Sequence, residues 1–193
     1  KTTVTNAKVS FATKSAYSGS AIYSTAGIYL ENCSRCIVQN NELFNIEGFG
    51  VACVGTGEGN EIKQNYIHDN LGGILNNGDS NNHNKFVEND IGFNNVSGGS
   101  GNDGILINAT SIALASSGHL VTHNRIYNSG EHGMYSQCGN SIISNNTVYA
   151  NAECGIKVAK CRNTSVLDNI CHSNQSNLQV QSGFENVLVQ GNN

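Results

Sequence analysis

The chain has 193 residues, which is enough for one well-buried domain and too few for two of typical size. Charged residues make up only 12% of the sequence, Pro is absent, and the net charge at pH 7 is −4. The acidic balance argues against nucleic acid as a partner, and the absence of any apolar run near the ~18 residues that span a bilayer argues against a membrane.

Residues 1–26 are less regular than the rest of the chain. Asn6 is the one sign there of the unit that repeats further on, and it indicates one additional, irregular coil. We predict a single domain over residues 1–193, with regular coils from residue 27 onward.

From residue 27 a unit of about 23 residues repeats. Each unit opens with Gly and an apolar residue: Gly27-Ile28, Gly50-Val51, Gly73-Ile74, Gly104-Ile105, Gly133-Met134 and Gly155-Ile156. An apolar column follows, made of Val38, Ile62, Phe86, Val121, Ile143, Val166 and Val189. Three residues later the column is Asn41, Asn65, Asn89, Asn124, Asn146, Asn169 and Asn192, and two further on it is Leu43, Ile67, Ile91, Ile126, Val148 and Cys171. The Asn column steps by 24, 24, 35, 22, 23 and 23 residues.

A period of about 23 residues fits either a leucine-rich repeat or a coil of a parallel β-helix. Leu is sparse here, Gly and Asn punctuate every few residues, and no apolar stripe of helical period is long enough for a helix. Two or three short strands per unit remain, each paired with its counterpart one coil away at about 4.8 Å. The sequence therefore predicts an all-β, right-handed parallel β-helix of about seven to eight coils.

The Asn column is expected to be structural. Amides stacked at the coil spacing can donate and accept along the axis, and Asn tolerates the left-handed backbone of a sharp bend. A second, looser series is Asn45, Asn70, Asn94, Asn128, Asn151 and Asn174, and bend cysteines such as Cys33, Cys138 and Cys161 are expected to stack as well. The seven Cys are expected to be reduced, and the apolar columns between Phe86 and Val166 are expected to be buried.

Insertions are concentrated between residues 73 and 133. Two bends are enlarged, at residues 95–101 and 108–118, and a third loop is expected at residues 76–84. Since strands of a β-helix can vary little, enlarged bends are expected to build the walls of a binding groove.

The residues just before each Gly-Ile pair are expected to stack beside these insertions. They bring Asp103, Glu131, His132 and Glu153 into one ridge. Carboxylates one coil apart, at about 5 Å, would suit a retaining glycosidase, and two coils apart, at about 9.5 Å, an inverting one. We predict Asp103 and Glu131 as the acid/base pair, with His132 orienting substrate or tuning their proton affinity. The alternative is that these are ordinary solvent-facing bend residues.

Further residues are expected to contact substrate. Asp79 and His83, on the third loop, are assigned to sugar hydroxyls, and Glu153 joins them as a binding residue. The basic group Lys157, Lys160 and Arg162 could neutralise a uronate carboxylate, although a solvated face is the favoured alternative. We expect no metal site, with His119 and His123 as a weaker alternative, and no cofactor, with calcium left open.

Coils of the form G-I-x(n)-I-x-x-N-x-I-x-x-N over residues 27–193 resemble the right-handed parallel β-helix superfamily typified by pectate lyases. The resemblance implies a polysaccharide substrate. The superfamily includes lyases, galacturonases, uronan epimerases and phage tailspike depolymerases. The chain departs from the epimerase motif aspartate-proline-histidine and from the proline near the pectate lyase arginine, because it has no Pro.

The resemblance leads to two hypotheses of function. The first is a fragment of a depolymerase that acts on bacterial polysaccharide by glycoside hydrolysis or β-elimination, located extracellularly or on a virion surface, as a homotrimer. The second is a non-catalytic β-helix that serves as a stalk or as a carbohydrate-binding adhesive surface.

Overall fold

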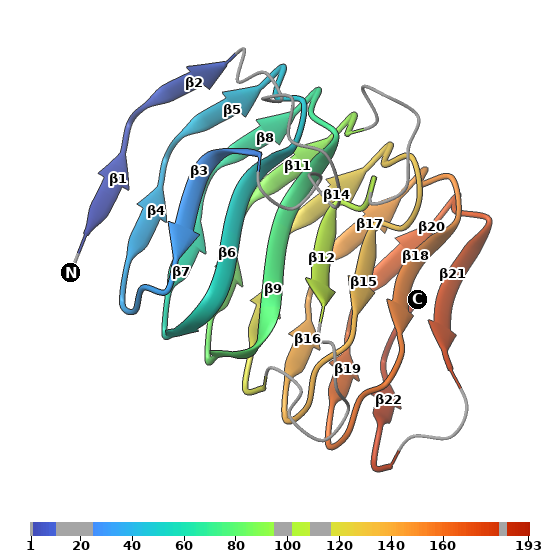
Figure 1. Cartoon of the computed structure of the whole chain (residues 1–193). Helices are drawn as coiled ribbons and strands as arrows, with labels where there is room; N and C mark the ends of the chain where they lie inside the picture. Colours follow the sequence, from blue (N-terminus) through green and yellow to red (C-terminus); the bar gives the residue numbers. More distant parts are fainter. Residues whose placement is uncertain (1, 11–24, 95–101, 109–116, 182–184) are drawn as a thin grey trace, which may run out of the picture.

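The computed structural model describes residues 2–10, 25–94, 102–108, 117–181 and 185–193. These residues form a right-handed parallel β-helix of about six turns that contains no helix, as the sequence predicted (Figure 1). The larger count of seven to eight coils stays a prediction. Every strand pairs in parallel with its counterpart in the next turn, so three sheets run the length of the stack.

The strands are divided among the three sheets in a repeating order along the chain. Sheet A contains β1 (Thr3–Thr5), β4 (Ile37–Gln39), β7 (Glu61–Lys63), β10 (Lys85–Val87), β13 (Leu120–Thr122), β16 (Ile142–Ser144), β19 (Ser165–Leu167) and β22 (Leu188–Gln190). Sheet B contains β2 (Lys8–Ser10), β5 (Glu42–Phe44), β8 (Tyr66–His68), β11 (Asp90–Gly92), β14 (Arg125–Tyr127), β17 (Thr147–Tyr149) and β20 (Ile170–His172). Sheet C contains β3 (Ala26–Glu31), β6 (Phe49–Glu58), β9 (Gly72–Asn82), β12 (Ile105–Asn108), β15 (Met134–Ser136), β18 (Cys154–Val158) and β21 (Ser176–Val180).

The predicted interior is confirmed. The side chains expected inside are fully buried: Phe86, Ile91, Val121, Ile126, Ile143, Val148 and Val166. Val189, which ends the first apolar column on β22, is 43% exposed. The opening glycines of the coils border this interior, because a Cβ on Gly104 would lie 2.3 Å from Cγ2 of Ile126.

Replacing Ile143 with Ala is expected to destabilise the protein. Ile143 is fully buried on β16 and pairs with Val121 and Val166 in the adjacent turns. The substitution removes apolar contacts and leaves a cavity, so the free energy of unfolding should fall by about 2–5 kcal/mol. Chemical denaturation measures it, and Ile142→Ala is the matched control because Ile142 is 46% exposed. Equal losses for both variants would contradict the assigned interior.

The Asn ladder is confirmed. In each step the backbone N–H and the side-chain Nδ2 of one Asn both donate to Oδ1 of the next Asn, as between Asn124 and Asn146, where both distances are 3.0 Å. The series continues without a break from Asn41 to Asn192. In all of these Asn–Asn bonds the earlier turn supplies the donor and the later turn supplies the acceptor.

The left-handed backbone does not lie at the ladder Asn. It lies one residue earlier, at the mostly exposed positions Asn40, Gln64, Glu88, His123, Asn145 and Asp168, whose φ angles are 53–57°. The bend thus uses two adjacent residues: an outer one that turns the chain and an inner Asn that closes the hydrogen bonds. The requirement for Asn therefore comes from the ladder rather than from the backbone angle.

The prediction of a second Asn series was wrong in part. Its stacked position is Asn70, Asn94, Asn151 and Asn174, whereas Asn45 and Asn128 are the left-handed residues one position earlier. The ladder site after Asn45 is Ile46, whose N–H donates to Asn70 Oδ1 at 3.0 Å. The two positions are adjacent in the chain and Asn occurs at both, so the sequence pattern did not distinguish them.

A third ladder was missed because its members differ in type. Backbone N–H groups of Cys36, Asn60, Asn84 and His119 donate in turn to the side chains of Asn60, Asn84, His119 and Ser141. The expected cysteine stacking is confirmed for Cys138 and Cys161, because Cys138 N–H donates to Cys161 Sγ at 3.2 Å. Stacking of Cys33 stays a prediction. All seven Cys are free thiols.

The loop expected at residues 76–84 is also wrong, because most of it continues strand β9 to Asn82. Beyond a register shift at Val54 and Thr56, this extension pairs with the end of β6, Ser80 lying opposite Thr56 and Asn82 opposite Glu58. The polar sequence suggested a loop, but its backbone groups are used in the sheet. The expected first coil is present as β1 and β2, with Asn6 at the left-handed position.

Candidate functional site

The predicted ridge of ionisable residues lies where the strands of sheet C begin. His132 O accepts from Gly104 N at 3.0 Å, Cys154 O from Gly133 N at 2.9 Å, and Glu131 O from Glu153 N at 2.9 Å. The residues before each Gly-apolar pair therefore stack in register on successive turns, as predicted. Asp103, His132 and Cys154 form one column, and Glu131 and Glu153 form the column beside it.

Asp103 is the buried carboxyl group of this cluster. Only 2% of its surface is exposed, and its Oδ1 accepts a hydrogen bond from His132 N–H at 3.1 Å. Burial first, and then the charge of Glu131, raise its pKa to about 7, although the hydrogen bond from His132 opposes the shift. A carboxyl group in this state can exchange a proton near neutral pH, as acid/base catalysis requires.

The His132 side chain lies between a carboxylate and a cation. Its Nδ1 accepts from Cys154 N–H at 3.2 Å and lies 3.4 Å from Glu153 Oε2, while its Nε2 lies 3.3 Å from Lys157 Nζ. Burial, followed by the positive charge of Lys157, lowers the pKa of the imidazole. Both effects favour the neutral form of the imidazole.

The direction of these hydrogen bonds sets the column apart from the Asn ladders. Here the later turn donates to the earlier one, from His132 N–H to Asp103 and from Cys154 N–H to His132. In the Asn ladders the earlier turn donates to the later one. The Asp103 carboxyl group therefore ends a short chain of bonds.

Two further residues belong to the cluster: Lys157, for which the sequence favoured a solvated face over contact with a uronate, and Tyr135, which the sequence did not assign. Lys157 is half-buried and its Nζ lies 5.2 Å from the ring centre of Tyr135, a cation–π contact. Tyr135 packs edge-on against His132. The two residues are register partners on β15 and β18, so their spacing of one coil was the signal that could have found them. Lys160 and Arg162 are exposed, as a solvated face requires.

Asp79 and His83 lie apart from this cluster. Gly73, near the start of β9, donates to Asp103 O at 3.0 Å. Asp79 lies six residues further along the extended strand, about 20 Å away. His83 is exposed in the bend that follows β9. The structure therefore does not bring these two residues to the carboxylates, and the predicted groove walls at residues 95–101 and 109–116 lie outside the described residues.

No group of three metal-ligating side chains is close enough to hold a metal ion in the part of the chain that the structure describes. His119 is buried in the third ladder, where its Nδ1 accepts from Asn84 N–H, and burial lowers its pKa to about 4. His123 is exposed. Over the same described ranges, no helix is long and apolar enough to cross a membrane.

The three stacked sheets and the continuous ladders define a parallel β-helix protein. The sequence of residues 82–193 matches the model of a family described as the right-handed β-helix region, and the chain belongs to this family. None of the curated proteins matches the sequence.

Several solved structures share the fold. The periplasmic alginate epimerase AlgG is 17% identical with a TM-score of 0.69, covering 86% of this chain and 47% of that one. A point mutant of AlgG is 18% identical with a TM-score of 0.70, and the match covers the same shares of the two chains. The A-module of mannuronan C-5 epimerase AlgE4 from Azotobacter vinelandii is 16% identical with a TM-score of 0.57, covering 82% of this chain and 52% of that one. The chain thus spans about half the length of the structures it matches.

Proposed function

We propose that this chain acts on an extracellular polysaccharide by acid/base chemistry, through glycoside hydrolysis or β-elimination. The observation that carries the proposal is the buried Asp103, whose pKa is raised to about 7 in a cluster with Glu131, Glu153 and His132. Two carboxyl groups with different proton affinities are what glycoside cleavage uses.

Each residue of the cluster has a part in the proposed reaction. In hydrolysis, protonated Asp103 donates its proton to the glycosidic oxygen as the bond to the anomeric carbon breaks. Glu131 is the second carboxylate, which either takes a proton from the attacking water or forms a glycosyl intermediate that water then cleaves. In β-elimination, ionised Asp103 removes the proton next to a uronate carboxyl group held by Lys157, a C=C bond forms as the bond to the glycosidic oxygen breaks, and that oxygen takes a proton from water. His132 keeps Asp103 in place through its backbone N–H. Glu153, beside His132, contacts sugar hydroxyls at the cluster. Asp79 and His83, about 20 Å along β9, contact hydroxyls of sugar units further along the same polymer.

The class of substrate has support from the shared fold. The matched structures are named as epimerases of alginate and of mannuronan, both of which are polysaccharides. At identities of 16–17%, the likeness shows only that the fold is shared. Experiment therefore has to identify the sugar and the bond that is broken.

The test is to incubate the protein with a panel of capsular polysaccharides, pectate and alginate. New reducing ends without ultraviolet absorbance indicate hydrolysis, and new absorbance from an unsaturated product indicates β-elimination. Proton NMR of the polymer detects a change of sugar configuration without cleavage, which would contradict both. No change in any polymer would favour the second candidate, a rigid carbohydrate-binding stalk, for which the unbroken Asn ladder is the favourable observation.

We further propose an extracellular or virion-surface location and a homotrimer, both of which accompany the depolymerase hypothesis. Light scattering of the purified chain measures its oligomeric state. A monomer at all concentrations would contradict the trimer without affecting the proposed chemistry.

A further inference from the structure

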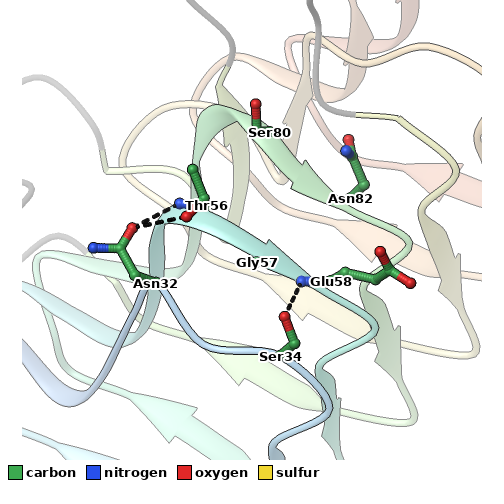
Figure 2. A pocket seen from close by; sticks show the side chains of 7 residues that line it. All are labelled: Asn32, Ser34, Thr56, Gly57, Glu58, Ser80 and Asn82. Atoms are coloured by element: carbon green, nitrogen blue, oxygen red, sulfur yellow. Dashed lines mark hydrogen bonds between the residues drawn. The ribbon is translucent and has the colours of Figure 1, made fainter.

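A polar hollow lies where the strands of sheet C end, whereas the Asp103 cluster lies where they begin. It measures about 270 Å³ and is formed by three successive turns (Figure 2). Its lining is made of the segment after β3, the end of β6 and the end of β9, which contribute Asn32, Ser34, Thr56, Glu58, Ser80 and Asn82. From Phe49, at the start of β6, nine residues of extended strand lead to Glu58, which is about 30 Å. The hollow is therefore separate from the proposed acid/base site.

The side chains of this hollow are held in place by the protein itself. Asn32 Oδ1 accepts from Thr56 N at 2.9 Å and from Thr56 Oγ1 at 3.2 Å, and Ser34 Oγ accepts from Glu58 N at 3.0 Å (Figure 2). Asn82 Oδ1 accepts from Ser117 N at 2.9 Å. Because these side chains are already ordered, a ligand would not have to fix them on binding.

The same bonds determine what the hollow can offer to a ligand. They use the carbonyl oxygens of two amides, so the amide hydrogens of Asn32 and Asn82 remain available as donors. Ser34 acts as acceptor and keeps its hydroxyl hydrogen. Glu58 is exposed, its carboxylate makes no ion pair with any other described residue, and it adds a charged acceptor. The hollow thus combines several neutral donors with one strong acceptor.

This combination fits a neutral sugar. Each sugar hydroxyl can donate and accept, so adjacent hydroxyls can donate to Glu58 while accepting from the amides and Ser34. Glu58 is the single charged residue of the lining, and it would repel a phosphate or a uronate. We infer that this hollow is a binding subsite for a neutral sugar unit of a polysaccharide, remote from the Asp103 cluster. The choice of a sugar as the ligand rests on the proposed function. The location of the subsite and its preference for a neutral unit rest on the residues that line the hollow.

The experiment is an NMR titration of the full chain, which at 20.4 kDa is suitable for amide spectra. The probes are oligosaccharides of a neutral glucan, of a neutral galactomannan and of alginate. We expect a neutral oligosaccharide to shift the side-chain amide signals of Asn32 and Asn82 and the backbone signal of Glu58. Alginate oligosaccharides should leave these signals unchanged.

A variant tests the acceptor directly. Glu58→Gln keeps the shape of the side chain and removes the charge, so the affinity for the neutral oligosaccharide should fall roughly tenfold. Glu185→Gln is the matched control, because Glu185 is also exposed and lies on the chain between β21 and β22. Unchanged affinity of Glu58→Gln for the neutral oligosaccharide, or no shift at the hollow with either neutral probe, would overturn the inference.

The outcome can be separated from that of the proposed function. Binding at the hollow by a protein that alters no polymer would leave the subsite standing and remove the enzymatic proposal. Activity on a polymer, with no shift at Asn32, Asn82 and Glu58 on titration with neutral oligosaccharides, would do the reverse. Asp103→Asn should abolish activity and leave the titration of the hollow unchanged.

Discussion

Asp103→Asn is expected to inactivate the protein and at the same time stabilise it above neutral pH. Asn cannot exchange the proton, so activity on a substrate found by the polysaccharide panel should fall about 10²–10⁴-fold. The amide oxygen still accepts from His132 N–H, so the local structure is retained. The wild-type carboxyl group is buried and has a pKa of about 7 in place of its ordinary 3.8.

The pH dependence follows from the sign of this shift. The folded chain holds the Asp103 proton more tightly than the unfolded chain, so the stability that this proton confers is complete below pH 3.8 and is lost as pH rises through 7. At pH 8 the variant should exceed the wild type by on the order of 4 kcal/mol in free energy of unfolding. Near pH 4 this advantage should disappear.

Urea denaturation at pH 4, 6 and 8 measures the difference. Asp168→Asn is the matched control, because Asp168 is exposed at a left-handed bend position that Asn also adopts. It should change neither activity nor the slope of stability with pH. A variant at Asp103 with full activity, or with the same pH dependence of stability as the wild type, would remove Asp103 from its proposed role.

Asn146→Ala is expected to produce the largest loss of stability among single changes in the bends. Asn146 is 1% exposed, and its Oδ1 accepts from both N and Nδ2 of Asn124 at 3.0 Å. Its Nδ2 donates to Val121 O at 3.0 Å and to Asn169 Oδ1 at 2.9 Å. Ala removes all four bonds and leaves buried partners unsatisfied, which should cost about 3 kcal/mol.

Thermal and chemical denaturation check this expectation. Asn145→Gly is the matched control: Asn145 is the adjacent residue, but it is exposed and has a φ angle of 54°, which Gly adopts without strain. It should alter stability by a few tenths of a kcal/mol. A melting curve of Asn146→Ala that overlays the control would contradict a stabilising ladder.

The fold could be predicted from the sequence because one residue type recurs at one position in every coil. The side chains of the five inner members make the same four bonds in each turn, which explains why Asn is kept at Asn65, Asn89, Asn124, Asn146 and Asn169. The third ladder escaped because Asn60, His119 and Ser141 all supply an acceptor in different ways. A pattern of residue types cannot reveal a position where only hydrogen-bonding capacity is shared.

The candidate site could be predicted in register but not in detail. The repeat placed Asp103 beside His132, yet the burial of Asp103 and the contact of His132 with Lys157 depend on packing around the column. The neutral-sugar hollow was missed although its signal was present. Asn32, Thr56 and Ser80 are spaced by 24 residues, as are Ser34, Glu58 and Asn82, the same step that separates the first three ladder Asn residues.

The common direction of the ladder bonds has a consequence for how such a chain can lengthen. Each inner ladder Asn donates from its N–H and Nδ2 to Oδ1 of the next Asn, and its own Oδ1 accepts the same two bonds from the previous Asn, so every coil offers the ladder the same partners as its neighbours. A tandem copy of one coil inserted between two others therefore meets matching partners on both sides without any change of sequence. Duplication of a single 22- to 24-residue unit is thus a route by which the stack can grow, and surface residues such as those at the ends of β6 and β9 are free to diverge afterwards.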